Sequence, residues 1–368
     1  GPFLRVVDDH SRRRLRRQQR NGEQREGCQQ YHGGFIDYII PDVAGKWLTC
    51  AVLFLVMAAG GTAQTTGEAA AHLKAGAVHL QRGEAVQAVA ELKAAIALQP
   101  DSAAGHMLLG QAYLAQRSLG LVAEAKAELQ QALDIDPTLF WARFYLARVY
   151  MDLGRYDRAQ SELEKGLEER PKVAHFIALL GEVKRKLGSP EASLELNAKA
   201  LAIDPALSPA HYHRALAYMD LKRDREAIAE LETATQSKYV ASDMCLTLGS
   251  LYMRKRRYKE AESICKRGIQ LDPSRSEGYL NLAQLYNAQG HSDKALAALK
   301  QALPPGKTFP TSPYFQQVQA DIFFERGRAY QAKKMTGEAM EAYALTLSVD
   351  PGREEAQRRL AELKSARR

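Results

Sequence analysis

A proline-marked period of 34 residues most constrains what this chain can fold into. Six prolines follow the pattern: Pro100, Pro137, Pro171, Pro205, Pro273 and Pro351. The middle members of the series lie 34 residues apart, one proline of the series is missing, and two repeats are longer by three and ten residues. A fixed period of this length is the signature of a stacked repeat array.

Other columns repeat together with the prolines. Counted along each period, residue 8 is small, residue 11 is usually tyrosine, and residues 20 and 27 are almost always small. Apolar residues at positions 4, 7, 8 and 11 share one face of a first helix, and those at 20, 24, 27 and 28 share one face of a second. Proline at position 32 ends the second helix. Glycines at position 15, namely Gly154, Gly188 and Gly290, mark the turn between the two helices.

Each period therefore predicts a helix–turn–helix hairpin. One hairpin cannot bury its own apolar face, but neighbours stacked in series share a continuous core. Eight periods cover residues 68–352, and the following segment, 353–368, places Ala356, Leu360 and Leu363 in a single apolar stripe. We therefore expect an all-α fold, an α-solenoid of stacked antiparallel helix pairs with a C-terminal capping helix.

The pattern is plainest in residues 140–171, FWARFYLARVYMDLGRYDRAQSELEKGLEERP, and again in residues 277–303. In these segments the chain closely resembles the tetratricopeptide repeat family. The family's tryptophan-like fourth position matches least well and holds His72, His106, Arg143, His211 and Cys245. The resemblance implies a superhelix whose first helices line a concave surface through positions 2, 5, 9 and 12.

The resemblance also implies that a protein or peptide partner binds on this concave face. The candidate peptide-binding residues are Trp141, Phe144, Arg148, Met151, Tyr212, Met219, Leu246, Met253, Leu280, Gln284, Asn287, Phe324 and Arg328. Many of them are aromatic or methionine, types that are enriched at binding surfaces. The chain lacks the lysine and asparagine set of the family's carboxylate-clamp receptors, so we expect a groove for an extended or helical peptide with apolar anchors. About half of these residues are expected to pack against neighbouring repeats instead.

No catalytic, cofactor-binding or metal-binding constellation stands out in the sequence. The Gly-Lys-Thr at 306–308 ends like a phosphate-binding loop, but Gln301 occupies a position where that motif needs glycine. His211 and His213 are two residues apart, so on a helix they point to different faces. The sequence therefore predicts a protein that is not an enzyme and has no cofactor.

Residues 1–45 do not fit the period. Six arginines fall between residues 12 and 20 without an acid, which is typical of a disordered basic extension, with a nucleic-acid or anionic-lipid arm as the alternative. No methionine precedes Met57, so part of this stretch is expected to be an over-extended gene start or a vector remnant. The net charge of +8 is spread too thinly over the array to predict a nucleic-acid partner.

Residues 46–63 are mostly apolar and end in the small residues Gly61, Thr62 and Ala63. A bilayer span takes roughly 20 apolar residues, whereas a signal-peptide core takes roughly 7–15. We expect a signal peptide cleaved after Ala63, or an uncleaved anchor through residues 47–63. Either one predicts an exported array in a bacterial periplasm or anchored at the inner membrane; the array is cytoplasmic if this segment is not used.

The sequence thus predicts a non-enzymatic scaffold that binds a protein or peptide partner and helps to assemble a complex. The alternative is an accessory subunit that positions substrate for a separate catalytic protein in envelope biogenesis or secretion. Breaks in the period at 116–123 and 309–319 are candidate special loops. Cys245 and Cys265 occupy core-facing positions and are expected to be buried thiols, with a disulfide possible only in an exported protein.

Overall fold

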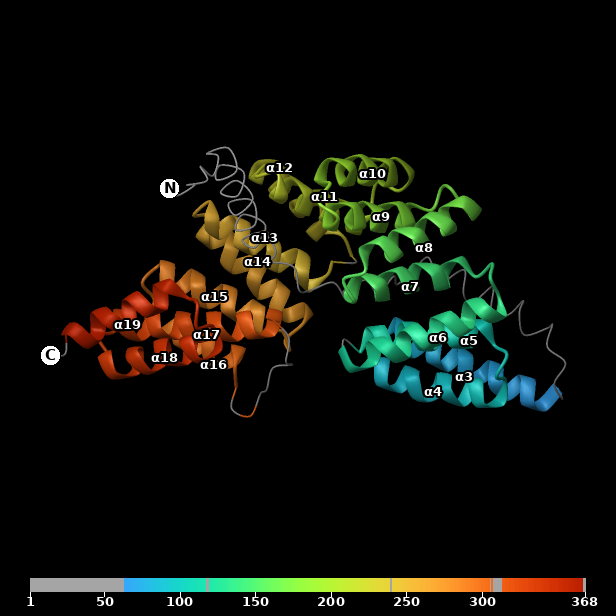
Figure 1. Cartoon of the computed structure of the whole chain (residues 1–368), viewed down its shortest axis with the longest axis horizontal. Helices are drawn as coiled ribbons and strands as arrows, with labels where there is room; N and C mark the ends of the chain where they lie inside the picture. Colours follow the sequence, from blue (N-terminus) through green and yellow to red (C-terminus); the bar gives the residue numbers. More distant parts are fainter. Residues whose placement is uncertain (1–62, 117–118, 239, 305, 307–312, 367–368) are drawn as a thin grey trace, which may run out of the picture. The chain divides into compact units, whose positions relative to one another are not determined.

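The computed structural model describes residues 63–116, 119–238, 240–304, 306 and 313–366. Within these ranges the chain is helical and contains no strand. Figure 1 shows the helices following one another in pairs. The predicted basic extension over 1–45 lies outside the described residues, and so does the apolar segment over 46–63 apart from Ala63.

Eight helix pairs and one further helix make up the described chain. The first helices of the pairs are α3 (Ala63–Gln81), α5 (Ala103–Ala115), α7 (Phe140–Asp152), α9 (Ala174–Lys186), α11 (Ser208–Asp220), α13 (Ser242–Arg254), α15 (Ser276–Ala288) and α17 (Pro313–Ala332). The second helices are α4 (Ala85–Leu98), α6 (Val122–Ile135), α8 (Tyr156–Glu169), α10 (Pro190–Ile203), α12 (Asp224–Gln236), α14 (Tyr258–Leu271), α16 (Ser292–Ala302) and α18 (Thr336–Val349). The additional helix is α19 (Glu354–Ala366). The predicted all-α fold of stacked helix pairs is confirmed.

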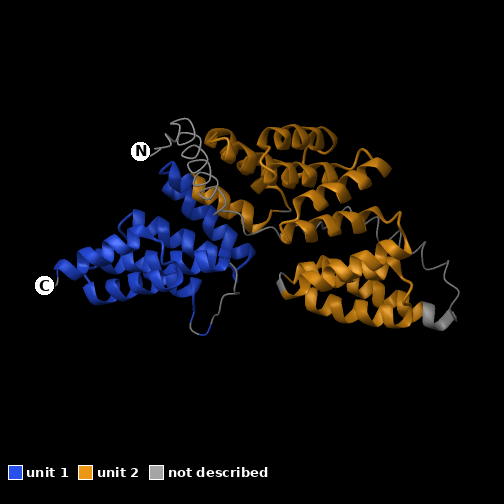
Figure 2. Ribbon diagram, in the orientation of Figure 1, with its two compact units in different colours: residues 1–34, 252–368 blue, residues 35–251 orange. Residues whose placement is uncertain are grey.

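The described helices divide into two compact units (Figure 2). Unit 2 is residues 35–251 and contains α3 to α12 and most of α13. The described part of unit 1 is the segment from Tyr252 onward, with the end of α13 and α14 to α19. The boundary between the units therefore falls inside a first helix.

Small residues at position 8 let the two helices of a pair approach closely. A Cβ atom on Gly76 would lie 2.5 Å from Cγ of Leu92, and one on Gly110 would lie 2.6 Å from Cγ of Leu129. Leu92 and Leu129 are both fully buried. Position 8 is therefore small because the leucine at position 24 already fills the space.

Position 4 forms a polar pair with position 23 of the same hairpin in four repeats of unit 2. These hairpin ties are His72–Glu91 (2.7 Å), His106–Glu128 (2.6 Å), Arg143–Glu162 (3.3 Å) and His211–Glu230 (2.7 Å). Where position 4 is apolar, position 23 is apolar as well, as with Ile177 and Leu196 or Phe323 and Ala342. In three ties the basic side chain also contacts the carbonyl oxygen of the preceding proline: His106 with Pro100 (2.9 Å), Arg143 with Pro137 (2.8 Å) and His211 with Pro205 (3.2 Å).

In the seven pairs whose position 15 the structure describes, the turn uses left-handed backbone at that position. Glycines occupy it at Gly83, Gly154, Gly188 and Gly290, with φ of 75°, 68°, 85° and 77°. Cations occupy it at Lys222, Arg256 and Lys334, with φ of 60°, 58° and 61°. The sequence predicted these turns only where position 15 is glycine, because left-handed backbone costs a residue with a side chain roughly 1–2 kcal/mol. The three turns with a cation at position 15 were therefore not recognised from the sequence.

The insertion predicted as a loop over 309–319 is partly helical. Proline is favoured at the first position of a helix, and α17 begins at Pro313 and runs for 20 residues. The hydroxyl of Tyr314 in this extension donates to a carboxylate oxygen of Glu277 in α15 at 2.5 Å. The extra residues thus lengthen α17 and attach it to the preceding repeat, while residues 307–312 lie outside the described chain.

Helix α19 covers the last hairpin of unit 1. Ala356 is fully buried against Phe324 and Tyr343, and Leu360 and Leu363 pack against the same cluster.

Neither Cys245 nor Cys265 forms a disulfide, and both are buried. Of the helices that the structure describes, none combines the length and apolar character needed to cross a membrane.

Candidate functional site

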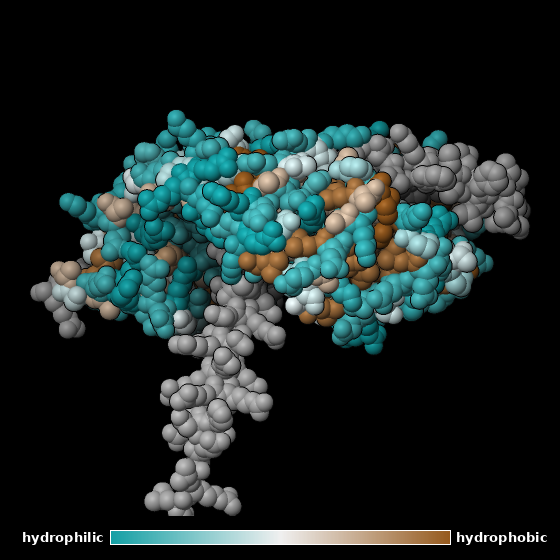
Figure 3. All heavy atoms as spheres, turned by 90° about the horizontal axis from the view of Figure 1, so that it is seen from above, coloured by the Kyte–Doolittle hydropathy of each residue, from teal (hydrophilic) through white to brown (hydrophobic). Residues whose placement is uncertain are grey.

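The thirteen predicted binding residues lie on the first helices of both units, on what we call the first-helix face (positions 2, 5, 9 and 12). Unit 2 carries Trp141, Phe144, Arg148, Met151, Tyr212, Met219 and Leu246, and unit 1 carries Met253, Leu280, Gln284, Asn287, Phe324 and Arg328. Seven are buried: Phe144, Arg148, Met151, Tyr212, Leu246, Leu280 and Phe324. The remaining six are half-buried. Figure 3 shows a marked gathering of apolar residues on the part of the molecule that belongs to unit 2.

The N-terminal ends of α7 and α9 form an aromatic cluster in unit 2. The ring of Trp141 lies 5.5 Å from that of Phe144 and 5.8 Å from that of Phe176, measured between centroids. Phe144 and Phe176 are buried, whereas Trp141 is half-buried. His175 lies 6.0 Å from the Trp141 ring. A partly accessible indole thus rests on rings that are already fixed by the core.

The C-terminal ends of α9 and α11 form a buried ionic cluster. Arg185 donates two hydrogen bonds to the Glu182 carboxylate, at 2.6 and 2.7 Å, and a third to Asp220 at 2.7 Å. Glu182 has no exposed surface and Arg185 is 6% exposed. Burial alone would raise the pKa of Glu182, but the charge and hydrogen bonds of Arg185 outweigh it and lower that pKa to about 2. Glu182 is therefore ionised at neutral pH, and Arg185 links it to Asp220 of the next repeat.

Other titratable groups surround this ionic cluster. Burial lowers the pKa of His213 to about 4, and its Nδ1–H donates to the carbonyl oxygen of Ala178 at 2.9 Å. Burial also lowers the pKa of Lys186 to about 8 and raises that of Asp152 to about 6, the latter against the opposing charge of Arg148. The first-helix face of unit 2 is thus aromatic at one end and ionic at the other.

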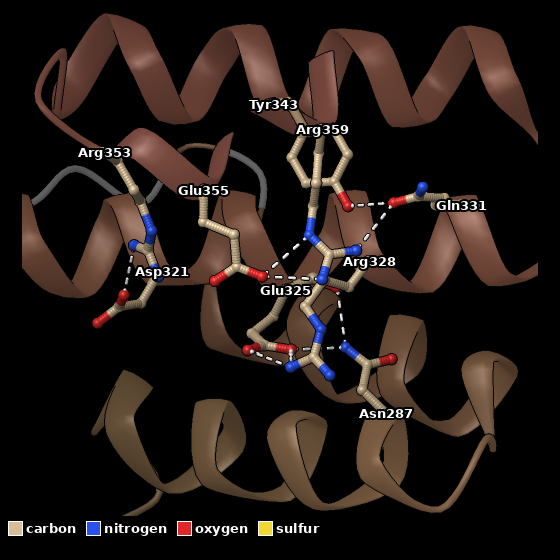
Figure 4. A network of polar contacts seen from close by, with 9 residues as sticks. All are labelled: Asn287, Asp321, Glu325, Arg328, Gln331, Tyr343, Arg353, Glu355 and Arg359. Carbon is tan, nitrogen blue, oxygen red and sulfur yellow. Dashed lines mark hydrogen bonds and ion pairs between the residues drawn. The ribbon is translucent and has the colours of Figure 1, made fainter. Parts of the chain in front are cut away.

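Unit 1 builds a different polar network from α15, α17, α18 and α19 (Figure 4). Asn287 donates to the Glu325 carboxylate at 2.7 Å and to its main-chain oxygen at 2.9 Å, and Arg328 donates to both carboxylate oxygens at 3.0 and 3.1 Å. Arg359 binds Glu355 at 2.8 Å, and Tyr343 donates to Gln331 at 2.8 Å. This network brings Asn287 and Arg328, two of the predicted site residues, to the same carboxylate.

Sequence reasoning missed the charged residues at the centre of both clusters. Glu182 and Arg185 occupy positions 9 and 12 of the fourth repeat, and Gln331 occupies position 12 of the eighth. The columns that selected the thirteen residues would have found these three as well. Glu325 lies at position 6, which most repeats fill with other residue types, so no column pointed to it.

The cations and carboxylates of the ionic cluster bind one another, and the described residues include no group of His, Cys, Asp and Glu that could hold a metal ion. An aromatic anchor on a fixed bed, such as Trp141 on Phe144 and Phe176, is a feature that carries binding energy at protein interfaces.

Comparison with protein families gives the same architecture. Models described as tetratricopeptide repeats match residues 76–117, 117–183, 208–239 and 252–322. These matches together cover more than half of the chain.

Individual proteins are similar over long stretches at low identity. The human protein O-mannosyl-transferase TMTC3 is 24% identical over 307 residues, which are 69% of this chain and 32% of that protein. The chain spans a third or less of the length of the curated relatives it matches. The structure of the APC/C hetero-tetramer Cut9-Hcn1 aligns with a TM-score of 0.60 at 15% identity, covering 87% of this chain and 61% of that one. The type IV pilus biogenesis factor PilW aligns with a TM-score of 0.50 at 21% identity, covering 60% of this chain and 98% of that one.

Proposed function

The chain belongs to the tetratricopeptide repeat family, and from that premise we propose that it is a non-enzymatic scaffold. It binds a protein or peptide partner on its first-helix face and helps to assemble a complex. Because a fold does not by itself name a function, the proposal depends on the side chains of that face. The observation that carries it is the half-buried Trp141 on its bed of buried aromatic rings.

Trp141 has the properties of an interface anchor. Tryptophan is among the residue types that dominate binding energy, because a large rigid ring is desolvated at little cost in side-chain entropy. Phe144 and Phe176 hold this ring in place before any partner arrives. Met219, also half-buried on the first-helix face of unit 2, would adapt to the partner's side chains.

The test compares Trp141→Ala with Leu153→Ala. Leu153 caps the same helix and is 48% exposed, so its loss removes an apolar side chain away from the first-helix face. We expect affinity purification to recover the same proteins with wild type and Leu153→Ala, and about tenfold less of them with Trp141→Ala. Trp141→Leu, which keeps more of the packing, guards against a folding defect. Unchanged recovery with both Trp141 variants would refute the proposal.

Phe144 and Tyr212 are unsuitable for such a test. They are only 4% and 6% exposed, so their truncation leaves cavities in the core and lowers stability as well as binding. Their assignment as binding residues remains a prediction.

We further propose that the scaffold works outside the cytoplasm, exported or anchored through residues 47–63. The support is the composition of that segment, which suits a signal sequence. Fractionation of cells that express the full chain with a C-terminal tag tests this. Recovery of the whole population from the cytosol, at the uncleaved mass, would contradict it.

A second function is favoured by the human relative that is named an O-mannosyl-transferase. In this alternative the array is an accessory subunit that positions substrate for a separate catalytic protein. The two functions differ in what co-purifies. A co-eluting catalytic protein whose turnover falls with Trp141→Ala supports the accessory role, whereas a partner without catalytic activity supports the scaffold.

A further inference from the structure

The second helix α10 of unit 2 has a polar residue at a core position where its neighbours have an apolar one. Position 24, which faces the small residue at position 8, is leucine in most repeats but asparagine at Asn197. The equivalent residues on the two flanking second helices are Leu163 in α8 and Leu231 in α12, and none of the three has any exposed surface. Helix α10 therefore buries an amide where α8 and α12 each bury a leucine.

The amide of Asn197 is only partly satisfied. Its Nδ2 group donates to the main-chain oxygen of Ser193 at 2.9 Å and to the Ser193 hydroxyl at 3.3 Å. Its Oδ1 atom has no hydrogen-bond partner among the described residues. Both bonds stay within α10, so neither attaches this helix to α9. A buried acceptor without a partner costs free energy, and the favourable burial of a leucine is lost at the same place.

The backbone around Asn197 is that of a hairpin with leucine at position 24. A Cβ atom on Gly181 in α9 would lie 2.3 Å from Nδ2 of Asn197, and one on Gly110 would lie 2.6 Å from Cγ of Leu129. The two helices therefore approach each other closely in both hairpins. The asparagine is not required by the spacing of α9 and α10, and a leucine fits the same arrangement in the second repeat.

Helix α9 is held in unit 2 without the help of α10. On one side the ring of Phe176 lies 5.3 Å from the ring of Phe144 in α7, measured between centroids. On the other side Arg185 donates to Asp220 in α11 at 2.7 Å. These aromatic and ionic contacts join α9 to the first helices of both neighbouring repeats. The loss of α10 from its place would leave them intact.

We propose that α10 is a weak joint of unit 2, which detaches from α9 while α9 stays bound to α7 and α11. Segments with few buried apolar contacts open at low free energy, and among α8, α10 and α12 it is α10 that lacks the buried leucine. Leu196 and Leu201 still pack against the cluster around Ile177, so α10 returns to its place after each opening. The joint lets the second helices of unit 2 yield at the fourth repeat without disturbing the first-helix face.

Segment-resolved hydrogen exchange of the full chain tests this proposal, with Asn197→Leu as the variant. In wild type we expect the amides of α10 to be protected about tenfold less than those of α8 and α12, because one buried leucine is missing and one buried acceptor is unpaired. Asn197→Leu should slow exchange in α10 by a similar factor and leave α8 and α12 little changed. The wild-type comparison stands by itself if the variant does not fold.

Ser102→Ala is the control for opening of unit 2 as a whole. The Ser102 hydroxyl accepts a hydrogen bond from the N–H of Gly105 at 3.1 Å and caps α5, so its loss weakens a repeat that does not contain α10. This variant should speed exchange in α5 but not in α10. Equal acceleration of both helices would overturn the proposal, because α10 would then open only together with the unit. Equal protection of α8, α10 and α12 in wild type would overturn it as well, and so would unchanged exchange of α10 in a folded Asn197→Leu variant.

Discussion

The two units stabilise consecutive repeats with charged residues, but they bury those residues to different extents. In unit 2 Arg185 joins Glu182 to Asp220, and the side chains of Arg185 and Glu182 are 4% and 0% exposed. In unit 1 Arg328 binds Glu325, and the glutamate side chain is buried (6% exposed) while the arginine side chain is 35% exposed. The two glutamates are therefore both buried, but the two arginines stand in very different dielectric surroundings.

This difference decides what each charge contributes. A buried ion that loses its partner keeps a large desolvation cost, whereas a partly hydrated ion recovers much of that cost from water. Unit 2 should thus be sensitive to the loss of one charge, and unit 1 should be tolerant.

The largest effect is expected for Glu182→Ala. Removal of this carboxylate leaves Arg185 buried with Asp220 alone, so unit 2 should lose about 3–5 kcal/mol of unfolding free energy. Segment-resolved hydrogen exchange separates α9 from the helices of unit 1 and measures the loss where it occurs.

Glu226→Ala is the matched control for this variant. Glu226 also binds an arginine three residues away, Arg223 at 2.8 Å, but this pair lies on the surface, where both side chains are more than 40% exposed. Its loss should change stability far less than the loss of Glu182, because water screens both members of the pair. Equal effects of the two substitutions would mean that burial does not distinguish the clusters.

Acid should remove the contribution of Glu182. Its pKa is about 2 in the folded chain and 4.5 in the unfolded chain, so its contribution is present above pH 4.5 and is lost as the pH falls through about 2. His213, with a pKa lowered to about 4, acts in the same direction between pH 6.5 and 4, whereas Asp152, with a raised pKa, acts in the opposite direction.

The difference in stability between wild type and Glu182→Ala contains the contribution of Glu182 together with its effect on His213 and Lys186, whose pKa values the Glu182 charge raises. That difference should amount to a few kcal/mol at neutral pH and should narrow steadily below pH 4.5. Urea midpoints measured across the acid range test it. A difference that does not depend on pH would show that Glu182 contributes through packing and not through its charge.

Glu325→Ala in unit 1 should cost less, about 1–3 kcal/mol. The Glu325 carboxylate accepts hydrogen bonds from Asn287 and Arg328, and both donors lose this acceptor in the variant. Arg328 is accessible enough for water to take the place of the carboxylate. Exchange in α15 and α17 measures the change. A loss as large as that of Glu182→Ala would contradict the comparison between the units.

Sequence reasoning reached the fold because the period records local packing. The small residue at position 8 and the leucine at position 24 belong to one hairpin, so Gly110 and Leu129 appear as aligned columns. The bond from Arg185 to Asp220 joins two repeats, and no column records which residue lies opposite across that interface.

Two further features escaped for local reasons. The break in the period at 309–319 suggested a loop, yet Pro313 begins α17, where its missing N–H costs nothing. Arg256 gave no turn signal because left-handed backbone is associated with glycine. The binding role of the thirteen residues is a separate matter, since it depends on a partner that the chain does not contain.

The smallest effect concerns the hairpin ties of unit 2. In unit 1 the repeats around Tyr279 and Phe323 have apolar pairs at the same two positions. The hydrogen bond to Glu230 raises the pKa of His211, and the hydrogen bond to the Pro205 carbonyl adds to this effect. Burial and the charge of Arg214, which lies 3.1 Å from Glu230, lower that pKa but do not outweigh the two hydrogen bonds. The tie therefore stabilises α11 and α12 fully below pH 6.5, and its contribution, about 1 kcal/mol, is lost as the pH rises through the folded pKa.

Exchanging the tie for the pair found in unit 1 tests this interpretation. The double substitution His211→Tyr with Glu230→Ala reproduces Tyr279 with Ala298. The variant should fold, and its stability should lack the decrease above pH 6.5 that the tie contributes in wild type. His211→Tyr alone should be less stable than the double variant, because the half-buried Glu230 would lose the closer of its two cations and keep only Arg214. Thermal melts across this pH range measure both variants. If the single variant were as stable as the double one, positions 4 and 23 would not act as a pair, and their matched residue types in the eight repeats would need another explanation.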